Sequence, residues 1–457
     1  MSPRILPAPA TTALVALLGL LAALLAVVAP QPAAADTRAM PGHFTGYAFD
    51  QCQAPSQSAM DAWWNASPYA GIGIYIAGDL RFCRVQTHLD ATWVARQART
   101  GWRLLPLTVG RQASCSTVER YQDHLIDDNP TKGYAAARGQ GRREARSTVR
   151  AARALGIGKR SVLWYDIEAF PTTSTRCRES ALAFLSAWTN TLHNLDFRSG
   201  VYSSAASGIA VLDQARRAGR HTMPDFLWVA EWVAASSYRR PPTAVPPSLQ
   251  SSFYDSAWWV AQGRVMRQYR GDHDERYGGV RINIDTNYLN LGRGSRVPRA
   301  QATCGVEIDY DRYRRFTQGS RGEQIRAAQC LLRQLGHYRK KVLRPRFTPA
   351  TKAAVYRFQT ASGLPRHGKL NRRVWVALLT AAPIPAATPV SKYGSATHAV
   401  RRIQRALNAT GGARLPITGF YGFETTQAVR DYQRAVGLPA NGVVAPTTWA
   451  TLRAGRS

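Results

Sequence analysis

Two carboxylic acids stand together near the end of one strand-like run of the sequence. The stretch SVLWYDIEAF (Ser161–Phe170) has the composition of a buried strand and carries Asp166 and Glu168. Because side chains alternate along a strand, these two acids share one face with Trp164. Neighbouring carboxyl groups push their pKa values apart, so that one keeps its proton while the other is ionised. The pair is therefore suited to acid-catalysed cleavage of a glycosidic bond.

Further polar and aromatic residues stand near the ends of other strand-like runs. We predict that Glu168 donates the proton, and that Asp166 raises its pKa and stabilises the cationic transition state. Asp50 and Asp285 are predicted to orient a water molecule, or an acetamido group if the substrate carries one. The candidate substrate-binding residues, which would stack on sugar rings or bond to hydroxyl groups, are Tyr75, Tyr202, Glu231, Trp232, Gln268 and Tyr269.

These residues also have simpler structural explanations, which the sequence leaves open. Asp166 and Glu168 would form ion pairs with an arginine, Asp50 would cap the following loop and Asp285 would form a turn. The tyrosines and Trp232 would serve in packing. We expect no metal and no cofactor, because the sequence has no HExxH, CxxC, GxSxG or GxxxxGK[ST] motif and its nine histidines are scattered.

The elements that must position these residues form an alternating pattern. Amphipathic helical stretches such as Arg142–Gly156 and Arg178–Asp196 separate eight strand-like runs. The runs are Phe44–Asp50, Gly71–Gly78, Arg103–Gly110, Ser161–Glu168, Arg198–Ser204, Phe226–Trp232, Arg264–Tyr269 and Val280–Leu289. Eight such units are typical of a (β/α)8 barrel, although a doubly wound open sheet gives a similar alternation. In a barrel, acids at the carboxyl ends of the strands would meet at the rim that carries active sites. The polar stretch Gly271–Gly279 is expected to be a loop between the last two strands.

The N-terminus has the layout of a secretory signal peptide. Arg4 precedes the apolar run Ala13–Ala29, and the small residues Ala33–Ala35 precede Asp36. We predict residues 1–35 as the signal peptide, with an uncleaved membrane anchor as the alternative. No later segment approaches the ~20 apolar residues of a membrane span, so we expect an exported protein without stable membrane insertion after cleavage.

Six cysteines are an even number, which in an exported chain favours three disulfides. Two follow the first and second strand-like runs, and two follow the third and fourth, so each of these pairs would tie neighbouring loops at the rim. The remaining two would pair with each other. The expected disulfides are Cys52–Cys83, Cys115–Cys177 and Cys304–Cys330.

The formal net charge of the chain is +32. A charge of this size attracts polyanions, among which an exported protein meets anionic wall polymers. No nucleic-acid-binding motif is recognisable, so nucleic acid is not expected as a partner. Part of the charge would simply be solvated arginine. A function that depended on charge alone would show an affinity that falls steeply with salt and ignores sugar identity.

Two related segments follow the eight strand-like runs. Gly319–Gly336 matches Gly394–Gly411, and Ala354–Leu379 matches Ala428–Leu452, as expected for two copies of one small helical unit. The Pro/Ala-rich stretch Ala381–Val390 between them predicts a stiff linker without a core.

The motifs of these repeats resemble the peptidoglycan-binding domain type 1, a three-helix wall-targeting module. Each copy has a Val/Ile-x-x-x-Gln-x-x-Leu helix, an aromatic-Gln-x-x-x-Gly-Leu-Pro stretch and a closing Trp-x-x-Leu. The resemblance implies two such domains, at residues 317–380 and 391–455. The second copy keeps a glycine-aromatic-glycine turn in TGFYGFETTQAV (Thr418–Val429), whereas RPRFTPATKAAV (Arg344–Val355) of the first lacks both glycines. We therefore expect the second copy to bind the wall better.

Six short motifs stand along the eight strand-like runs. They are FDQCQAPS (Phe49–Ser56), IYIAG (Ile74–Gly78), DIEAF (Asp166–Phe170), GVYSS (Gly200–Ser204), VAEW (Val229–Trp232) and IDTNYL (Ile284–Leu289). With these motifs, residues 43–296 resemble a secreted actinobacterial glycoside hydrolase-like domain of unknown function, similar to family 25 muramidases. The resemblance implies a barrel with an Asp on the first strand and an Asp-x-Glu on the fourth, here Asp50, Asp166 and Glu168.

Taken together, these features predict an α/β protein with a (β/α)8 TIM-like barrel and two small all-α three-helix repeats. The predicted function is that of a secreted, cell-wall-associated hydrolase of peptidoglycan or a related wall polysaccharide. The alternative is a non-catalytic wall-glycan-binding protein that keeps the barrel as a pseudo-hydrolase, because fold does not imply activity.

Overall fold

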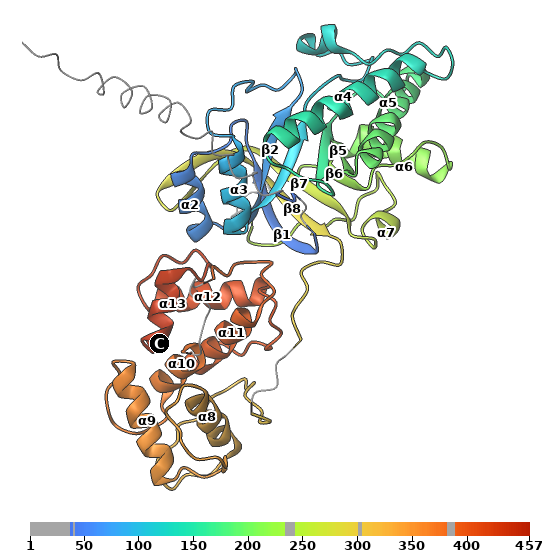
Figure 1. Ribbon diagram of the computed structural model, residues 1–457. Coiled ribbons are helices and arrows are strands. Elements are labelled where there is room, and N and C mark those ends of the chain that lie inside the picture. Colours follow the sequence, from blue (N-terminus) through green and yellow to red (C-terminus); the bar gives the residue numbers. More distant parts are fainter. Residues whose placement is uncertain (1–36, 40–41, 234–242, 300–303, 382–388) are drawn as a thin grey trace, which may run out of the picture.

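The computed structural model describes residues 37–457 apart from 40–41, 234–242, 300–303 and 382–388 (Figure 1). The predicted signal peptide lies outside these residues, as does most of the predicted linker between the repeats. Within the described part of the chain, no helix combines the length and the apolar composition needed to cross a membrane. The elements of the first half are β1 (Phe44–Asp50), α2 (Gln57–Ala66), β2 (Tyr69–Ala77), α3 (Ala91–Thr100), β3 (Arg103–Thr108), the 3-10 turn η1 (Glu119–His124), α4 (Ala135–Ala154), β4 (Val162–Asp166), α5 (Thr175–Asn194), β5 (Arg198–Ser204), the π-helical turn η2 (Ala205–Ile209), α6 (Ala210–Arg217), β6 (Phe226–Ala230), α7 (Ser256–Trp259), β7 (Arg264–Tyr277) and β8 (Val280–Leu291).

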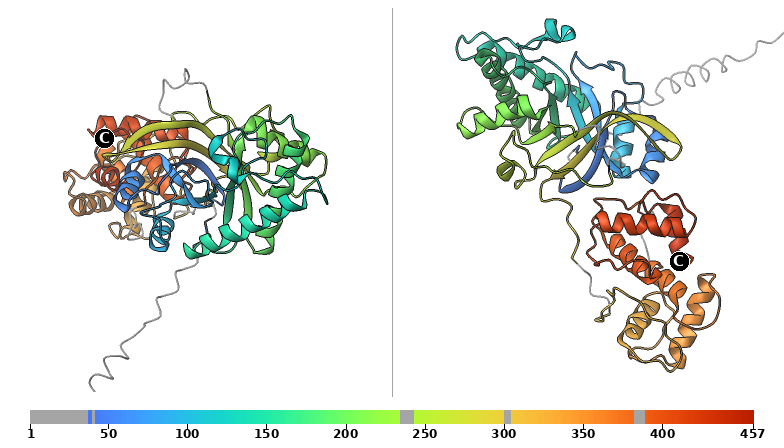
Figure 2. Two further views of the ribbon diagram at one scale, coloured as in Figure 1. Left: turned by 90° about the horizontal axis from the view of Figure 1, so that it is seen from above. Right: turned by 180° about the vertical axis from the view of Figure 1, so that it is seen from behind.

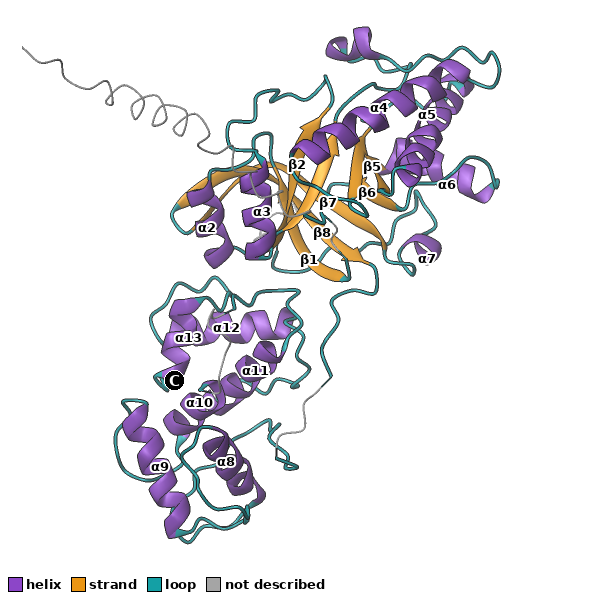
Figure 3. Cartoon of the chain, in the orientation of Figure 1, coloured by secondary structure: helices purple, strands orange, loops and turns teal. Residues whose placement is uncertain are grey.

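Strands β1 to β8 close into a barrel in sequence order, which confirms the predicted fold class. The helices between the strands lie outside the barrel (Figure 3). Alternate strand residues therefore pack in two separate places, between the strands and the helices or inside the barrel. Large side chains such as Trp164, Trp228 and Met266 fill the interior of the barrel and form a packed core there.

The last strand differs from the predicted (β/α)8 pattern. β8 runs antiparallel to both β7 and β1, and the predicted polar loop Gly271–Gly279 is largely part of a long β7–β8 hairpin. Gly278 and Gly279 close this hairpin with φ values of 58° and 84°. Two consecutive positive φ values suit a two-residue hairpin turn, and such a short connection leaves no crossover helix that could make the strands parallel.

The second half of the chain forms two helical repeats. Their elements are α8 (Glu323–Gln334), α9 (Pro349–Ala361), α10 (Arg372–Thr380), α11 (His398–Thr410), α12 (Phe423–Ala435) and α13 (Pro446–Arg453). The repeats share one continuous apolar core, because α10 of the first packs against α11 and α13 of the second. Trp375 and Trp449 are fully buried in it. The second repeat lies between the barrel and the first repeat (Figure 2).

Three disulfides join the six cysteines in the predicted pairs. Cys52–Cys83 links the loops that follow β1 and β2, and Cys115–Cys177 links the loop after β3 to the start of α5. Cys304–Cys330 ties the segment after the barrel to α8 of the first repeat. Two of the three bonds thus restrain loops at the same end of the barrel, where the candidate site lies.

Candidate active site

The four predicted catalytic acids line one cavity of about 270 Å³ at the carboxyl ends of the parallel strands. Asp50 ends β1, Asp166 ends β4, Glu168 follows two residues later and Asp285 comes from β8. In the described part of the chain, no group of three or more His, Cys, Asp or Glu residues is arranged to hold a metal ion. The cavity lining brings together Asp50, Asp166, Glu168 and Asp285.

Asp285 reaches this cavity for a different reason from the one predicted. Because β8 is antiparallel, its carboxyl end lies at the opposite end of the barrel. Asp285 instead stands in the middle of its strand, where it pairs in register with Asp50 of β1. The backbone N–H of Asp272, on the neighbouring arm of the hairpin, donates a 2.6 Å hydrogen bond to Asp285 Oδ1. The hairpin thus supplies both the acid and the group that fixes it.

Asp50 is buried and receives three side-chain hydrogen bonds. Asn287 Nδ2 donates to Oδ1 at 2.6 Å, Gln268 Nε2 donates to Oδ1 at 3.4 Å, and Tyr75 O–H donates to Oδ2 at 3.0 Å. Burial and the charge of Asp285 raise the pKa of Asp50 to about 7, against the opposing effect of these hydrogen bonds. The carboxyl group is thus held in one position and titrates near neutral pH.

The Gln268 amide connects two of the acids to two aromatic side chains. Its Nε2 donates to Asp285 Oδ2 at 3.1 Å as well as to Asp50. Its Oε1 accepts from Tyr202 O–H at 2.9 Å and from Trp232 Nε1 at 3.0 Å. Since each end of the amide has the partners it requires, Gln268 is fixed in orientation and in turn fixes the spacing of the two carboxyl groups.

Asp166 and Glu168 form the other half of the cluster. Burial raises the pKa of Asp166 well above its usual range, and the charges of Glu168 and Asp50 raise it further. Asp166 Oδ1 is buried and has no hydrogen-bond partner among the described residues. Burial also raises the pKa of Glu168, while the charge of Arg120 lowers the pKa of both acids. Arg120 lines the same cavity. Among the described residues, however, neither Asp166 nor Glu168 forms an ion pair.

The segment that carries Glu168 is fixed by Gln112, a buried residue that the sequence interpretation missed. Its Oε1 accepts from the Glu168 backbone N–H at 2.7 Å, and its Nε2 donates to the Asp166 carbonyl at 2.9 Å. The side chain thus replaces strand pairing just where β4 ends. Nothing in the sequence around Gln112 indicates this role, because the contact joins positions more than fifty residues apart.

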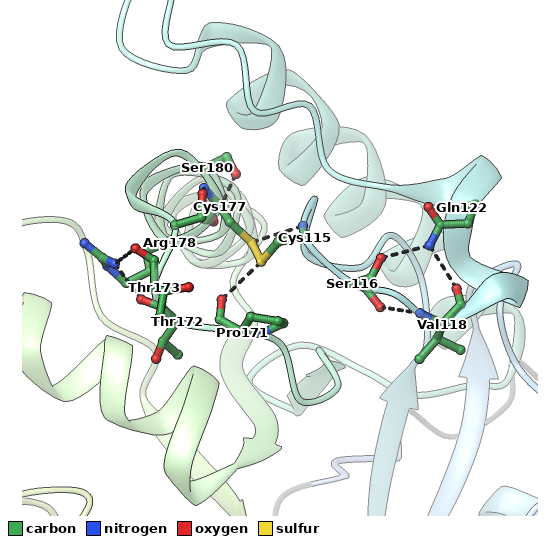
Figure 4. The surroundings of a disulfide bond; sticks show 11 residues. Cys115, Ser116, Val118, Gln122, Pro171, Thr172, Thr173, Cys177, Arg178 and Ser180 are labelled. Atoms are coloured by element: carbon green, nitrogen blue, oxygen red, sulfur yellow. Dashed lines mark hydrogen bonds between the residues drawn. A yellow bond between two sulfur atoms is a disulfide. The ribbon is translucent and has the colours of Figure 1, made fainter.

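Arg120 was also missed. It belongs to the turn η1, and the Cys115–Cys177 disulfide holds the loop that leads to this turn (Figure 4). The disulfide holds the loop after β3 against the start of α5, and the backbone N–H of Cys115 donates to Cys177 Sγ at 3.2 Å. Within the loop, Gln122 Nε2 donates to the carbonyls of Ser116 and Val118 at 2.8 and 3.1 Å. These bonds close the turn η1 around Arg120. Only the position of this arginine after the third strand-like run could have suggested it.

The predicted substrate-binding residues are divided by the structure. Tyr75 lines the cavity, while Tyr202, Trp232 and Gln268 form the hydrogen-bonded group beside it. Glu231 and Tyr269 do not line the cavity. Glu231 lies beside Arg267, whose Nη1 is 3.8 Å from its Oε2, and Tyr269 is buried in the core outside the strands. Position near a strand end did not reveal that these side chains point to the outer face of the barrel.

A closed barrel with clustered carboxyl groups at the carboxyl ends of its strands defines a protein of the glycoside hydrolase-like class. The chain belongs to the Rv2525c-like, glycoside hydrolase-like domain family, whose model matches residues 61–289. The peptidoglycan binding domain model matches twice, at residues 321–378 and 397–452. Together these domains make the chain a cell-wall-related protein.

Several solved structures are similar to the chain. An uncharacterized protein of B. stearothermophilus has 18% identity and a TM-score of 0.32, covering 53% of this chain and 95% of its own. The Tat-secreted protein Rv2525c of Mycobacterium tuberculosis has 14% identity and a TM-score of 0.35, with coverage of 54% and 98%. The modular autolysin LytC of Streptococcus pneumoniae has 12% identity and a TM-score of 0.31, with coverage of 53% and 46%. Among curated proteins, none matches the chain.

Proposed function

We propose that the barrel hydrolyses a glycosidic bond in peptidoglycan or a related wall polysaccharide. The observation that carries this proposal is the convergence of four carboxyl groups on one cavity, where burial raises the pKa of each. Glycoside hydrolysis generally needs one carboxyl group that keeps its proton and a second that is ionised. A buried cluster of acids provides both forms, because its members cannot all carry a charge at once.

Glu168 is the proton donor in this proposal. It lies on the loop beyond β4, where it is less buried than Asp166, and its raised pKa keeps the carboxyl group protonated at higher pH. It transfers this proton to the glycosidic oxygen as the bond between that oxygen and the anomeric carbon breaks. Asp166, with its unpaired Oδ1, stabilises the positive charge that develops on the sugar.

Asp50 and Asp285 orient the group that attacks the anomeric carbon. Their register pairing and the shared Gln268 amide hold both carboxyl groups on one side of the cavity. If the sugar carries an acetamido group, the carbonyl oxygen of that group can attack the anomeric carbon first. Water then hydrolyses the cyclic intermediate that this attack forms. When water attacks directly, its oxygen bonds to the anomeric carbon and its proton passes to the Asp50 or Asp285 carboxylate that orients it. When the acetamido group attacks first, the water that later bonds to the anomeric carbon gives its proton back to the Glu168 carboxylate.

Export and wall attachment belong to the same proposal. Three disulfides require an oxidising compartment, which a secreted, wall-associated protein occupies. The two repeats would bind peptidoglycan and raise the local concentration of the barrel on an insoluble substrate. The same proposal assigns residues 43–296 to the barrel and residues 317–380 and 391–455 to the two repeats.

The test is the release of reducing sugars from purified peptidoglycan and from other wall glycans. We expect release by the wild type and a loss of about 100-fold or more in Glu168→Gln, the usual effect of removing a general acid. Glu231→Gln is the matched control, because Glu231 lies outside the cavity, and it should retain activity. Wild-type protein that pellets with the wall but releases no sugar would instead support the non-catalytic, glycan-binding function.

A further inference from the structure

Phe82 lies at the edge of the acid-lined cavity with its side chain in solvent. It is 86% exposed, more than any other large hydrophobic residue of the described chain, and it lines the cavity together with Asp50 and Glu168. Single exposed apolar residues are common on protein surfaces. The exposure of Phe82 therefore indicates a function only in combination with the restraints on its loop.

The loop between β2 and α3 is fixed on both sides of Phe82. On one side, Arg81 donates from Nε to the Gly78 carbonyl at 3.0 Å and from Nη1 to the Tyr75 carbonyl at 3.2 Å. On the other side, Cys83 is bonded to Cys52. These two anchors restrain the backbone on both sides of Phe82.

Gln86 adds a second restraint to the same loop. Its Nε2 donates to the carbonyls of Cys52 and Cys83 at 2.8 and 3.1 Å, and its Oε1 accepts from the Ala54 N–H at 2.9 Å. The loops after β1 and β2 are thus joined by the disulfide and by two of these hydrogen bonds, while the third lies within the loop after β2. The ordering entropy of the Phe82 backbone has already been lost before any ligand arrives, which favours binding.

We propose that Phe82 is a stacking platform for one sugar ring of the glycan, on one side of the bond to be cleaved. This inference rests on the proposed function. Trp232 supplies the other platform: it is 57% exposed, and it follows β6, which lies opposite β2 in a ring of eight strands. A glycan lying across the barrel mouth contacts both rings, with the acids between them. The apolar C–H face of a pyranose suits the face of an aromatic ring.

The binding experiment uses the full chain with Glu168→Gln, so that no turnover occurs. The probe is a peptide-free hexasaccharide of alternating N-acetylglucosamine and N-acetylmuramic acid, titrated by calorimetry. Phe82→Ala is expected to weaken binding by about 5–10-fold at the barrel site. Phe82→Tyr keeps the ring and should retain the affinity, whereas Phe82→Leu keeps apolar surface without a ring and should lose it. Phe253→Ala, which removes a 42% exposed phenylalanine outside the cavity, is the matched control.

The possible results separate this inference from the proposed function. Binding by the repeats is common to all variants, so a difference between Phe82→Ala and Phe253→Ala reports on the barrel. Equal affinities for these two variants, with sugar release still dependent on Glu168, would overturn the platform and leave the hydrolase intact. Equal loss in Phe82→Ala and Phe82→Tyr would also contradict stacking. Weaker binding in Phe82→Ala without any sugar release would support the platform in a glycan-binding barrel.

Discussion

The ammonium group of Lys392, in the second repeat, donates a 2.8 Å hydrogen bond to the carbonyl of Tyr69 in the barrel. It also donates to the Trp64 carbonyl at 2.7 Å and lies 4.5 Å from the centre of the Trp64 ring. Lys392 is 2% exposed, and burial lowers its pKa well below the usual range. Lysine is almost never buried without partners, so this contact fixes the second repeat to one place on the barrel. Tyr69 begins β2, which puts the contact at the end of the barrel opposite the acids.

Replacing Lys392 should release the second repeat from the barrel. Lys392→Met keeps an apolar stem of similar length but removes the ammonium donor from the Trp64 and Tyr69 carbonyls, at a cost of about 1–3 kcal/mol for each one left buried without a partner. We expect an increased radius of gyration in small-angle X-ray scattering and faster proteolysis between residues 292 and 318. Lys340→Met removes an exposed lysine of the first repeat and should scatter like the wild type. Unchanged scattering by Lys392→Met would show that the lysine does not hold the repeats in place.

Gly394 offers an independent test of the same interface. Its φ is 88°, and a Cβ there would lie 2.2 Å from the Thr45 carbonyl oxygen of β1. Gly437 has a similar φ of 75°, but a Cβ there would meet nothing within 4 Å. Both Gly394→Ala and Gly437→Ala should lose about 1 kcal/mol from backbone strain. Only Gly394→Ala should also expand the protein in X-ray scattering. Equal expansion in both variants would count against a close contact at Thr45.

The sequence predicted the fold and the acids better than it predicted the residues that hold the acids. Alternation and strand ends suffice to place Asp50, Asp166 and Glu168, because parallel strands bring their carboxyl ends to one rim. Asn287 could also have been found, since it lies two residues after Asp285 on the same strand face. Gln112 and Lys392 could not, because their roles depend on contacts between distant segments whose side chains satisfy single backbone groups. The antiparallel direction of β8 was not predicted, because a pair of glycines after a polar stretch is equally compatible with a loop and with a hairpin turn.

The fixed orientation of Gln268 predicts a large effect of a small chemical change. In Gln268→Glu, an oxygen replaces Nε2, so the new side chain faces Asp50 and Asp285 with no hydrogen to donate unless it is protonated. We expect a loss of roughly 3 kcal/mol of unfolding free energy at pH 7, from a buried charge beside two acids. The loss should shrink at pH 4.5, where the three carboxyl groups can be protonated. Gln268→Met adds no charge but removes a hydrogen bond that lowers the pKa of Asp50, so its deficit should grow with pH less than that of Gln268→Glu.

The raised pKa of Asp50 predicts how stability changes with pH. Burial and Asp285 raise this pKa from 3.8 to about 7, so between these values the folded chain holds a proton that the unfolded chain has released. The contribution of Asp50 to stability is therefore fully present below pH 3.8 and is lost as the pH rises through 7. Asp50→Asn cannot titrate, so from pH 4 to 8 the wild type should lose unfolding free energy relative to this variant, on the order of 3 kcal/mol. Chemical denaturation across this range measures the difference.

Asp225 provides a control with the opposite sign. Burial raises its pKa, but hydrogen bonds from the Ser199 N–H and the His193 ring outweigh this effect and lower the pKa below its usual value. Its contribution to stability is thus present above pH 3.8 and is lost as the pH falls. Asp225→Asn should therefore be destabilised most at neutral pH, and the wild type should gain stability relative to it from pH 3 upward. If Asp50→Asn followed the same trend as Asp225→Asn, Asp50 would be ionised in the folded protein at neutral pH.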